Sequence, residues 1–350
     1  MKEYYSPADF FKTQKYDAHI HYHTFNNLFV RKANNNNIRL LTINTNFDFF
    51  PMDTQFEISQ LLHKKHPQSF DFISTFDATP FTSKTFADDT VEHIKKCMAA
   101  GARGIKIWKN IGMALKNDDG QYVMADDPVF DPIFTFLQKE KIPLLAHLGE
   151  PRNCWLPLEQ MTAGFGLKYY NENPNHHMYL HPEVPSYEQQ IIARDRILER
   201  YPELVFVGAH LGSMEWNLEE VAKRFERHQN FYVDISGRFN YILEQTLRSR
   251  NYVIDFFETY QNRILYGSDC FVSQYNSRKW MHLFCKCFPQ LYMNLLFGSF
   301  YRTVKNNWLF FATDKVIKIE KMHIEGLKLS KNIVDKIFYE NTRCLYYRRS

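Results

Sequence analysis

The 350-residue sequence has few cysteines and no long apolar run. Its six cysteines are isolated, apart from a Cys-x-Cys pair at Cys285 and Cys287, so they do not resemble the disulfide framework of a small secreted domain. No run of about 18 apolar residues occurs, which argues against a membrane-spanning helix. The polar start lacks the apolar centre of a secretion signal. We therefore expect a cytoplasmic protein with reduced thiols.

The sequence also lacks a large excess of charge of one sign. It has 43 basic and 39 acidic residues, which gives a formal net charge of +4. Because so small an excess favours neither nucleic acid nor a membrane as a partner, we expect a small-molecule substrate instead. Glycines number only 13, and none forms the phosphate-binding pattern G-x-x-x-x-G-K. A Gly-x-Ser-x-Gly nucleophile elbow is absent as well.

Eight short apolar or β-branched runs recur along the chain, and most are followed by a helical or polar segment. The runs are Tyr16–His23, Ile38–Thr45, Ser69–Phe76, Gly104–Trp108, Ile142–Leu148, Leu204–Leu211, Phe231–Ser236 and Ile264–Asp269. Near-continuous apolar strands are typical of a parallel sheet that is covered on both faces. Eight alternations of strand and helix predict an α/β fold, a (β/α)₈ TIM barrel that occupies residues 1–350 as a single domain.

Helix starts are predicted from capping residues between these runs. Asp88 to Thr90 form an N-cap region, Asp127 with Pro128 opens another helix, and Ser186 has Glu188 close to a capping-box position. The segment 215–227 is expected to form a further helix.

Two stretches exceed the minimal repeat, and they follow the fifth and eighth strands. Residues 150–185 are rich in Pro, Asn, His and aromatic residues, and residues 271–325 are rich in Phe, Tyr, Trp and Met. Both leave the carboxyl ends of strands, where barrel active sites are built. We therefore expect two long loops that act as lids or substrate walls, with the aromatic cluster 297–311 used for packing or a subunit contact.

Four histidines and one aspartate occur near the carboxyl ends of predicted strands. His19 and His21 share one face of the first strand, because side chains at i and i+2 point the same way. His147, His210 and Asp269 close the fifth, sixth and eighth strands. The carboxyl ends of barrel strands meet at one mouth, so the five side chains are predicted to surround a shared divalent metal. Imidazoles and a carboxylate favour one Zn²⁺ with a water in an open position.

At this point the sequence resembles the amidohydrolase superfamily, in the amidohydrolase-2 branch that includes aminocarboxymuconate semialdehyde decarboxylase. The matching segments are DAHIH at 17–21, GARGIKIWKN at 101–110, IPLLAHLGEP at 142–151, FVGAHLG at 206–212, YVDISGR at 232–238 and ILYGSDC at 264–270. A further segment, at 337–343, resembles the closing helix of the family. The resemblance covers nearly the whole chain in order and does not specify a substrate.

The resemblance implies a role for each matching residue. His19, His21 and His147 correspond to metal ligands, and Asp269 to the aspartate that binds the metal or orients its water and acts as a base. His210 corresponds to a histidine that activates the water or polarises the substrate.

Lys106 in the fourth strand corresponds to the lysine that two-metal relatives carboxylate, which would make His210 a ligand of the second metal.

Four further residues are candidates for contacts with substrate. Arg238 ends the seventh strand, where a planar guanidinium can clamp a carboxylate in two contacts. Lys109 is a second candidate for an anionic group, and Arg152 and Trp155 begin the long segment after His147 as candidate pocket walls. Each could equally have a structural role, Arg238 in a salt bridge above all.

Three functions follow from this site. The first is a metal-dependent hydrolase that cleaves a C–O or C–N bond of a small, carboxylated molecule such as a lactone or cyclic amide. The second is a nonhydrolytic decarboxylase on the same scaffold, and the third is a metal-binding protein without turnover. The sequence leaves open the substrate, the choice between one and two metals, and whether the protein forms a homodimer.

Overall fold

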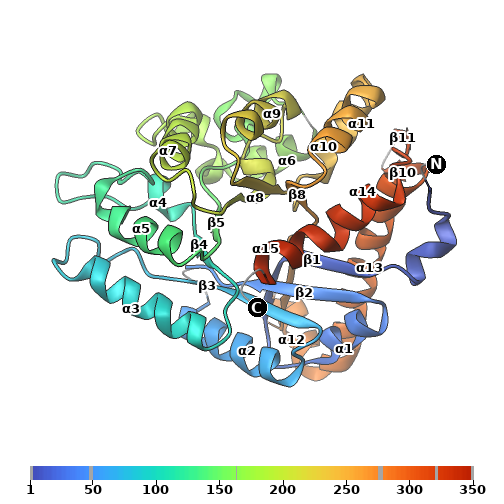
Figure 1. Cartoon of the computed structure of the whole chain (residues 1–350), viewed down its shortest axis with the longest axis horizontal. Helices are drawn as coiled ribbons and strands as arrows, with labels where there is room; N and C mark the ends of the chain where they lie inside the picture. Colours follow the sequence, from blue (N-terminus) through green and yellow to red (C-terminus); the bar gives the residue numbers. More distant parts are fainter. Residues whose placement is uncertain (1–2, 47–49, 163, 275–278, 320–321, 348–350) are drawn as a thin grey trace.

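The strands of the structure form one curled parallel sheet with helices outside it (Figure 1). This computed structural model describes residues 3–46, 50–162, 164–274, 279–319 and 322–347. The strand order β8-β7-β6-β5-β4-β3-β2-β1-β9 follows the chain from β1 to β8, and every pairing in the sheet is parallel. This confirms the predicted TIM barrel.

Most strands of the barrel are short, and most of their residues are buried. They are β1 (Lys15–His23), β2 (Ile38–Ile43), β3 (Phe70–Thr75), β4 (Ile105–Ile107), β5 (Leu144–Ala146), β6 (Phe206–Gly208), β7 (Phe231–Asp234), β8 (Ile264–Leu265) and β9 (Cys270–Ser273). A separate antiparallel hairpin pairs β10 (Val316–Ile319) with β11 (Met322–Glu325).

Most helices lie outside the sheet and cover it. They are α1 (Leu28–Asn35), α2 (Met52–Lys65), α3 (Phe86–Ala99), α4 (Asn110–Met113), α5 (Asp131–Lys139), α6 (Gly164–Glu172), α7 (Tyr187–Arg200), α8 (Ala209–Gly212), α9 (Leu218–Arg227), α10 (Phe239–Arg248), α11 (Arg250–Thr259), α12 (Lys279–Cys287), α13 (Pro289–Ala312), α14 (Lys331–Asp335) and α15 (Asn341–Tyr347). Six 3₁₀ turns, at 7–11, 128–130, 152–155, 158–160, 174–176 and 178–180, and a π-turn at 336–340 complete the described elements.

The predicted eighth strand, Ile264–Asp269, differs from the observed one because the chain bends in its middle. Its first part, β8, pairs with β7, and its continuation, β9, pairs with β1. Between them, the backbone carbonyl of Tyr266 accepts a hydrogen bond from Ala18 N at 2.9 Å, and Asp269 N donates one to His19 O at 2.8 Å. The bent segment therefore joins the two edges of the sheet and closes the barrel, with Asp269 at the bend.

Several helix boundaries differ from the predicted ones by a few residues. Helix α3 begins at Phe86, so Asp88 and Asp89 lie in its first turn, where acidic side chains favour the positive end of the helix dipole. The capping box of α7 pairs Ser186 with Gln189 and does not use Glu188. Helix α9 begins at Leu218, with Asn217 as its N-cap.

The two long segments are more ordered than predicted. Residues 150–185 contain α6 and four 3₁₀ turns. Residues 271–325 contain the 24-residue helix α13, which buries one aromatic face, including Phe297, Phe300 and Trp308. The aromatic cluster is thus a packing surface, as one of the two predicted alternatives stated.

No helix in the described part of the chain is long and apolar enough to span a membrane.

Gly267 lies in the bend that closes the barrel, and the space around it has no room for a side chain. A Cβ atom there would come within 2.7 Å of His19 Cβ and 2.9 Å of Ser236 Cβ. We predict that Gly267→Ala lowers the free energy of unfolding by about 1–3 kcal/mol, measured by urea unfolding, because the strands must move apart.

Gly298→Ala is the matched control. Gly298 lies inside α13, and nothing stands within 4 Å of the position its Cβ would take. The same change should therefore stabilise the protein by about 1 kcal/mol. Equal stability of Gly267→Ala and the wild type would contradict the described closure.

Candidate metal centre

The five predicted metal-site residues converge at the carboxyl ends of β1, β5, β6 and the bend after β8. The ring centroid of His210 is 4.9 Å from that of His19 and 4.4 Å from that of His147. The Nε2 atoms of His19 and His21 lie 3.7 Å and 3.6 Å from Asp269 Oδ1. Residues far apart in sequence thus form one cluster.

The tightest metal-sized group in the described part of the chain contains His19, His210 and Asp269. One ligand atom of each lies within 4.8 Å of those of the other two. His210, which the sequence suggested as a catalytic residue, therefore belongs to this group, whereas the predicted ligands His21 and His147 lie outside it. Either role for its Nε2 is compatible with this position.

Hydrogen bonds orient the imidazoles so that Nε2 faces the centre. The Nδ1 atom of His19 lies 2.8 Å from Asp234 Oδ2, and Nδ1 of His21 lies 3.0 Å from the carbonyl oxygen of Ile43. In His210, Nδ1 is 2.8 Å from the carbonyl oxygen of Ser236. Since these oxygens accept hydrogen bonds, Nδ1 carries the proton and Nε2 keeps a lone pair, as in metal-binding histidines.

His147 supports a metal at this place most directly. Its Nε2 atom is buried and has no hydrogen-bond partner among the described residues, while the whole residue is only 8% exposed. A buried nitrogen without a partner is energetically costly, and a metal ion satisfies it. Together with three further imidazoles and a carboxylate, this donor set fits a divalent transition metal such as zinc.

Burial keeps the imidazoles of His21, His147 and His210 neutral. It lowers the pKa of His21 to about 4 and that of His210 to about 3, and it lowers the pKa of His147 well below its ordinary value. Burial alone would raise the pKa of Asp269, but the nearby histidines outweigh it and hold that pKa well below the ordinary value. The site therefore offers neutral nitrogens and an ionised carboxylate, which are the protonation states that bind metal.

His210 and Asp269 both have a left-handed backbone, with φ values of 59° and 58°. Leu211, Gly212 and Ser213 continue with positive φ, so the chain makes a left-handed turn directly after β6. Non-glycine residues adopt this conformation at a cost of order 1–3 kcal/mol each, and such strain concentrates at functional sites. Hydrogen bonds to other segments hold two residues of this turn in place. His210 N donates to Asp234 Oδ1, and Ser213 Oγ donates to Leu148 O.

Lys106 lies in the same cluster, as its position in the fourth predicted strand required. Its Nζ atom is 3.5 Å from His19 Nε2, and the side chain is buried. Burial lowers the pKa of Lys106 to about 8, so a larger fraction of its amine is unprotonated at neutral pH than in an exposed lysine.

A cavity of about 560 Å³ lies beside the cluster, at the ends of β4, β5 and β7. It is lined by Trp108, Lys109, Met113, Glu150, Pro151, Gly166, Tyr169, Tyr170, Asn175, His176, Met178, Gly237, Arg238 and Tyr241. Gly237 connects it with the cluster, because a Cβ there would lie 2.7 Å from Asp269 Oδ2. Aromatic walls with a few charged groups are typical of a small-molecule site.

The candidate substrate residues divide into two groups. Arg238 and Lys109 line the cavity, with Lys109 paired to Glu150. Arg152 and Trp155 are not among its lining residues. The guanidinium of Arg152 lies 4.3 Å from the ring of Trp216, and Trp155 packs against Tyr187. In the loop after β5, His177 is buried and hydrogen-bonds to Leu156 O, so this loop histidine packs inside the segment.

Sequence reasoning missed Asp234, the residue that links the cluster together. Its carboxylate binds His19 Nδ1, accepts a hydrogen bond from His210 N, and accepts one from Ser236 N at 3.1 Å. The available signal was the one used for the other residues, since Asp234 is a polar residue at the end of an apolar strand. Glu215, a fully buried carboxylate that accepts from Arg152 N, gave no comparable signal.

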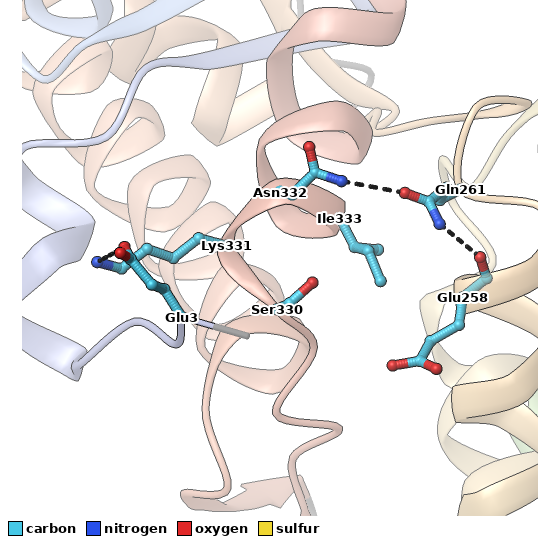
Figure 2. A pocket seen from close by; sticks show the side chains of 7 residues that line it. All are labelled: Glu3, Glu258, Gln261, Ser330, Lys331, Asn332 and Ile333. Atoms are coloured by element: carbon cyan, nitrogen blue, oxygen red, sulfur yellow. Dashed lines mark hydrogen bonds and ion pairs between the residues drawn. The ribbon is translucent and has the colours of Figure 1, made fainter. Parts of the chain in front are cut away.

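A further cavity, of about 630 Å³, has none of the cluster residues in its lining (Figure 2). It is formed by the end of α11, the start of α14 and the amino-terminal segment, and Gln261 and Asn332 hydrogen-bond within it. Because Gln261 precedes the amino end of β8, this cavity belongs to the edge where barrels concentrate stabilising contacts.

We predict that Asp234→Asn weakens zinc binding by roughly 10–100-fold, because an amide holds the His19 ring less firmly than a carboxylate. Competition with a chromophoric chelator measures this. The control is Asp126→Asn, which removes a carboxylate that pairs with the exposed Arg196 and should leave the affinity unchanged. Equal affinity of Asp234→Asn and the wild type would exclude the orienting role.

Among the known structures similar to this chain, one with a TM-score above 0.5 supports the fold. A dihydroxybenzoic acid decarboxylase from Polaromonas sp. JS666, solved with manganese and 2-nitroresorcinol, is 13% identical, with coverage of 97% of this chain and 98% of that one and a TM-score of 0.52. A 4-oxalomesaconate hydratase from Rhodopseudomonas palustris is 15% identical, with 89% and 76% coverage and a TM-score of 0.45. An amidohydrolase from Pseudomonas aeruginosa is 11% identical, with 98% and 100% coverage and a TM-score of 0.44.

The family is established by sequence. No curated protein matches the chain. The sequence model of the amidohydrolase family, in contrast, matches residues 80–348, which is well over half of the chain and includes His147, His210 and Asp269. The chain therefore belongs to the amidohydrolase-2 family of metal-dependent TIM-barrel enzymes.

Proposed function

We propose that this enzyme is a metal-dependent hydrolase that cleaves a C–O or C–N bond of a small carboxylated substrate, such as a lactone or cyclic amide. His19, His21, His147 and Asp269 would hold the metal, with His210 beside it. The observation that carries the proposal is the convergence of four imidazoles and one ionised carboxylate next to a cavity of about 560 Å³.

A bound divalent ion supplies an acidified water and polarises a substrate oxygen. We propose one Zn²⁺, since imidazole-rich sites with a carboxylate suit this ion. A carboxylated Lys106 would reach the same cluster and bridge a second ion, because its Nζ is 3.5 Å from His19 Nε2. Metal analysis of the purified protein distinguishes the two cases. The six free cysteines support a reducing compartment such as the cytoplasm.

His210 is placed to accept a proton and not to donate one. Its Nδ1–H is committed to the carbonyl oxygen of Ser236, and burial keeps the ring neutral. The remaining Nε2 lone pair can take a proton from the attacking water, which is a role that hydrolysis requires. The carboxylate of Asp269, whose side chain is 30% exposed, faces the same point and can orient that water.

Arg238 would bind the substrate's carboxylate. It lines the cavity, and its Nε is buried without a hydrogen-bond partner among the described residues. A carboxylate would satisfy this donor and make a charge-assisted contact. Trp108, Tyr170 and Tyr241 line the same cavity and would pack against a flat ring.

A nonhydrolytic decarboxylase is the second candidate. The aromatic cavity with its guanidinium also suits an aromatic carboxylic acid, and the dihydroxybenzoic acid decarboxylase has the same fold over nearly the whole chain.

The test is a screen of the zinc-loaded protein against lactones, cyclic amides and aromatic carboxylic acids in ¹⁸O-labelled water. Hydrolysis places ¹⁸O in the product, whereas decarboxylation releases CO₂ and leaves the product unlabelled. Chelation should abolish turnover, and zinc should restore it. His210→Asn should reduce kcat by roughly 10²–10⁴-fold with zinc retained, whereas His147→Ala should lose zinc as well. Turnover that survives full chelation would refute the proposal.

We further predict that Arg238→Met raises KM for a carboxylated substrate by roughly 10–100-fold with a smaller effect on kcat, because it removes a charge-assisted contact. For an uncharged analogue of the same substrate, Arg238→Met and the wild type should have similar KM values. The control is Arg227→Met, which removes an exposed guanidinium that pairs with Glu199. If both variants gave the wild-type KM, Arg238 would not bind the carboxylate.

A further inference from the structure

The chain's positive charge is concentrated in one segment that also lacks acidic residues. Between Asp269 and Asp314 the sequence has five basic and no acidic residues. The rest of the chain has the other 38 basic residues and all 39 acidic ones, so it carries no positive excess. The net charge of +4 is thus a property of this segment, most of which forms α12 and α13.

The same segment exposes large apolar side chains. Leu283 of α12 is 62% exposed, and Phe288, Leu291 and Leu295 at the start of α13 are 56%, 50% and 58% exposed. On a helix, positions 288, 291 and 295 share one face, because they are three and four residues apart. The opposite face of α13 is already buried in the core, so this stripe is a second apolar surface that the fold itself does not cover.

Unpaired cations accompany the stripe. Lys286 and Arg302 are exposed, and within the described part of the chain neither forms an ion pair. Arg302 lies seven residues after Leu295, so it extends the same stripe by two turns. We name this surface, formed by Leu283, Lys286, Phe288, Leu291, Leu295 and Arg302, the α12–α13 face.

The α12–α13 face adjoins the mouth of the barrel. Cys285, Lys286 and Pro289 line a cavity of about 550 Å³ together with residues at the carboxyl ends of β1 and β9, among them His23 and Ser273. Phe25, which is 50% exposed, lines the same cavity and adds an apolar group beside the face. The face therefore lies at the mouth side of the barrel, on which the metal centre opens.

We propose that the α12–α13 face docks on an anionic lipid surface. Exposed Leu and Phe side chains with neighbouring Lys and Arg are the combination by which peripheral proteins bind such surfaces, since apolar groups enter the interface and cations contact the headgroups. A second copy of the chain fits less well, because a two-fold contact would bring basic residues against basic residues without an acidic partner from the segment. The small net charge of the whole chain hides this local concentration.

The experiment is sedimentation of the full-length protein with vesicles of phosphatidylcholine alone and with vesicles that also contain phosphatidylserine. We expect binding to the anionic vesicles that weakens with added salt. Lys286→Gln should weaken it roughly fivefold through the loss of one cation. Leu291→Ser should weaken it by roughly tenfold through the loss of one inserted side chain. Hydrolytic activity in solution should not change with either variant.

Matched controls use helices other than α12 and α13. Leu247→Ser removes a leucine that is 52% exposed on α10, and Lys139→Gln removes an exposed lysine of α5. Both should bind anionic vesicles like the wild type. The proposal is overturned if the protein does not sediment with anionic vesicles, or if the control variants and the face variants bind these vesicles equally well. It is also overturned if Leu291→Ser instead abolishes a dimer seen by light scattering without vesicles.

Discussion

The bend between β8 and β9 is the constraint on which the rest of this structure depends. A sheet closes into a barrel when hydrogen bonds join its two edges. Here a single segment makes this connection, because it pairs with β7 before the bend and with β1 after it. Asp269 lies at the bend and donates its N–H to His19 O. The contact that closes the barrel is therefore also the one that brings the aspartate beside the first histidine.

Asp234 holds the parts of the histidine cluster in place through hydrogen bonds. A single buried carboxylate orients the His19 ring, fixes the backbone of His210 and binds Ser236, so three strands share one acceptor. Such a group keeps the unprotonated nitrogens pointed at one place, which is what a metal site requires before any metal binds. The strained turn at His210 and the low pKa values of the histidines follow from the same dense, buried packing.

Chemistry and surroundings are supplied by different parts of the barrel. The strand ends provide the ionisable cluster, whereas the segments after β4, β5 and β7 provide the aromatic cavity with Arg238 and Lys109. The segment after β9 provides neither. Its long helix α13 covers the barrel with one face and exposes the α12–α13 face with the other. Under the proposed function, one scaffold thus separates catalysis, substrate selection and surface contacts.

The sequence by itself determined the fold class and the family of candidate ligands, because strand periodicity and polar residues at strand ends are local patterns. From these patterns alone, with no interatomic distance, it assigned five residues to one site: His19, His21, His147, His210 and Asp269. Only the tertiary structure decided that Arg238 and Lys109 line the cavity while Arg152 and Trp155 lie outside it, since the direction of a loop depends on what it packs against. Likewise, Asp234 became important only when three strands met, because its role is a contact between distant segments and not a pattern along one of them.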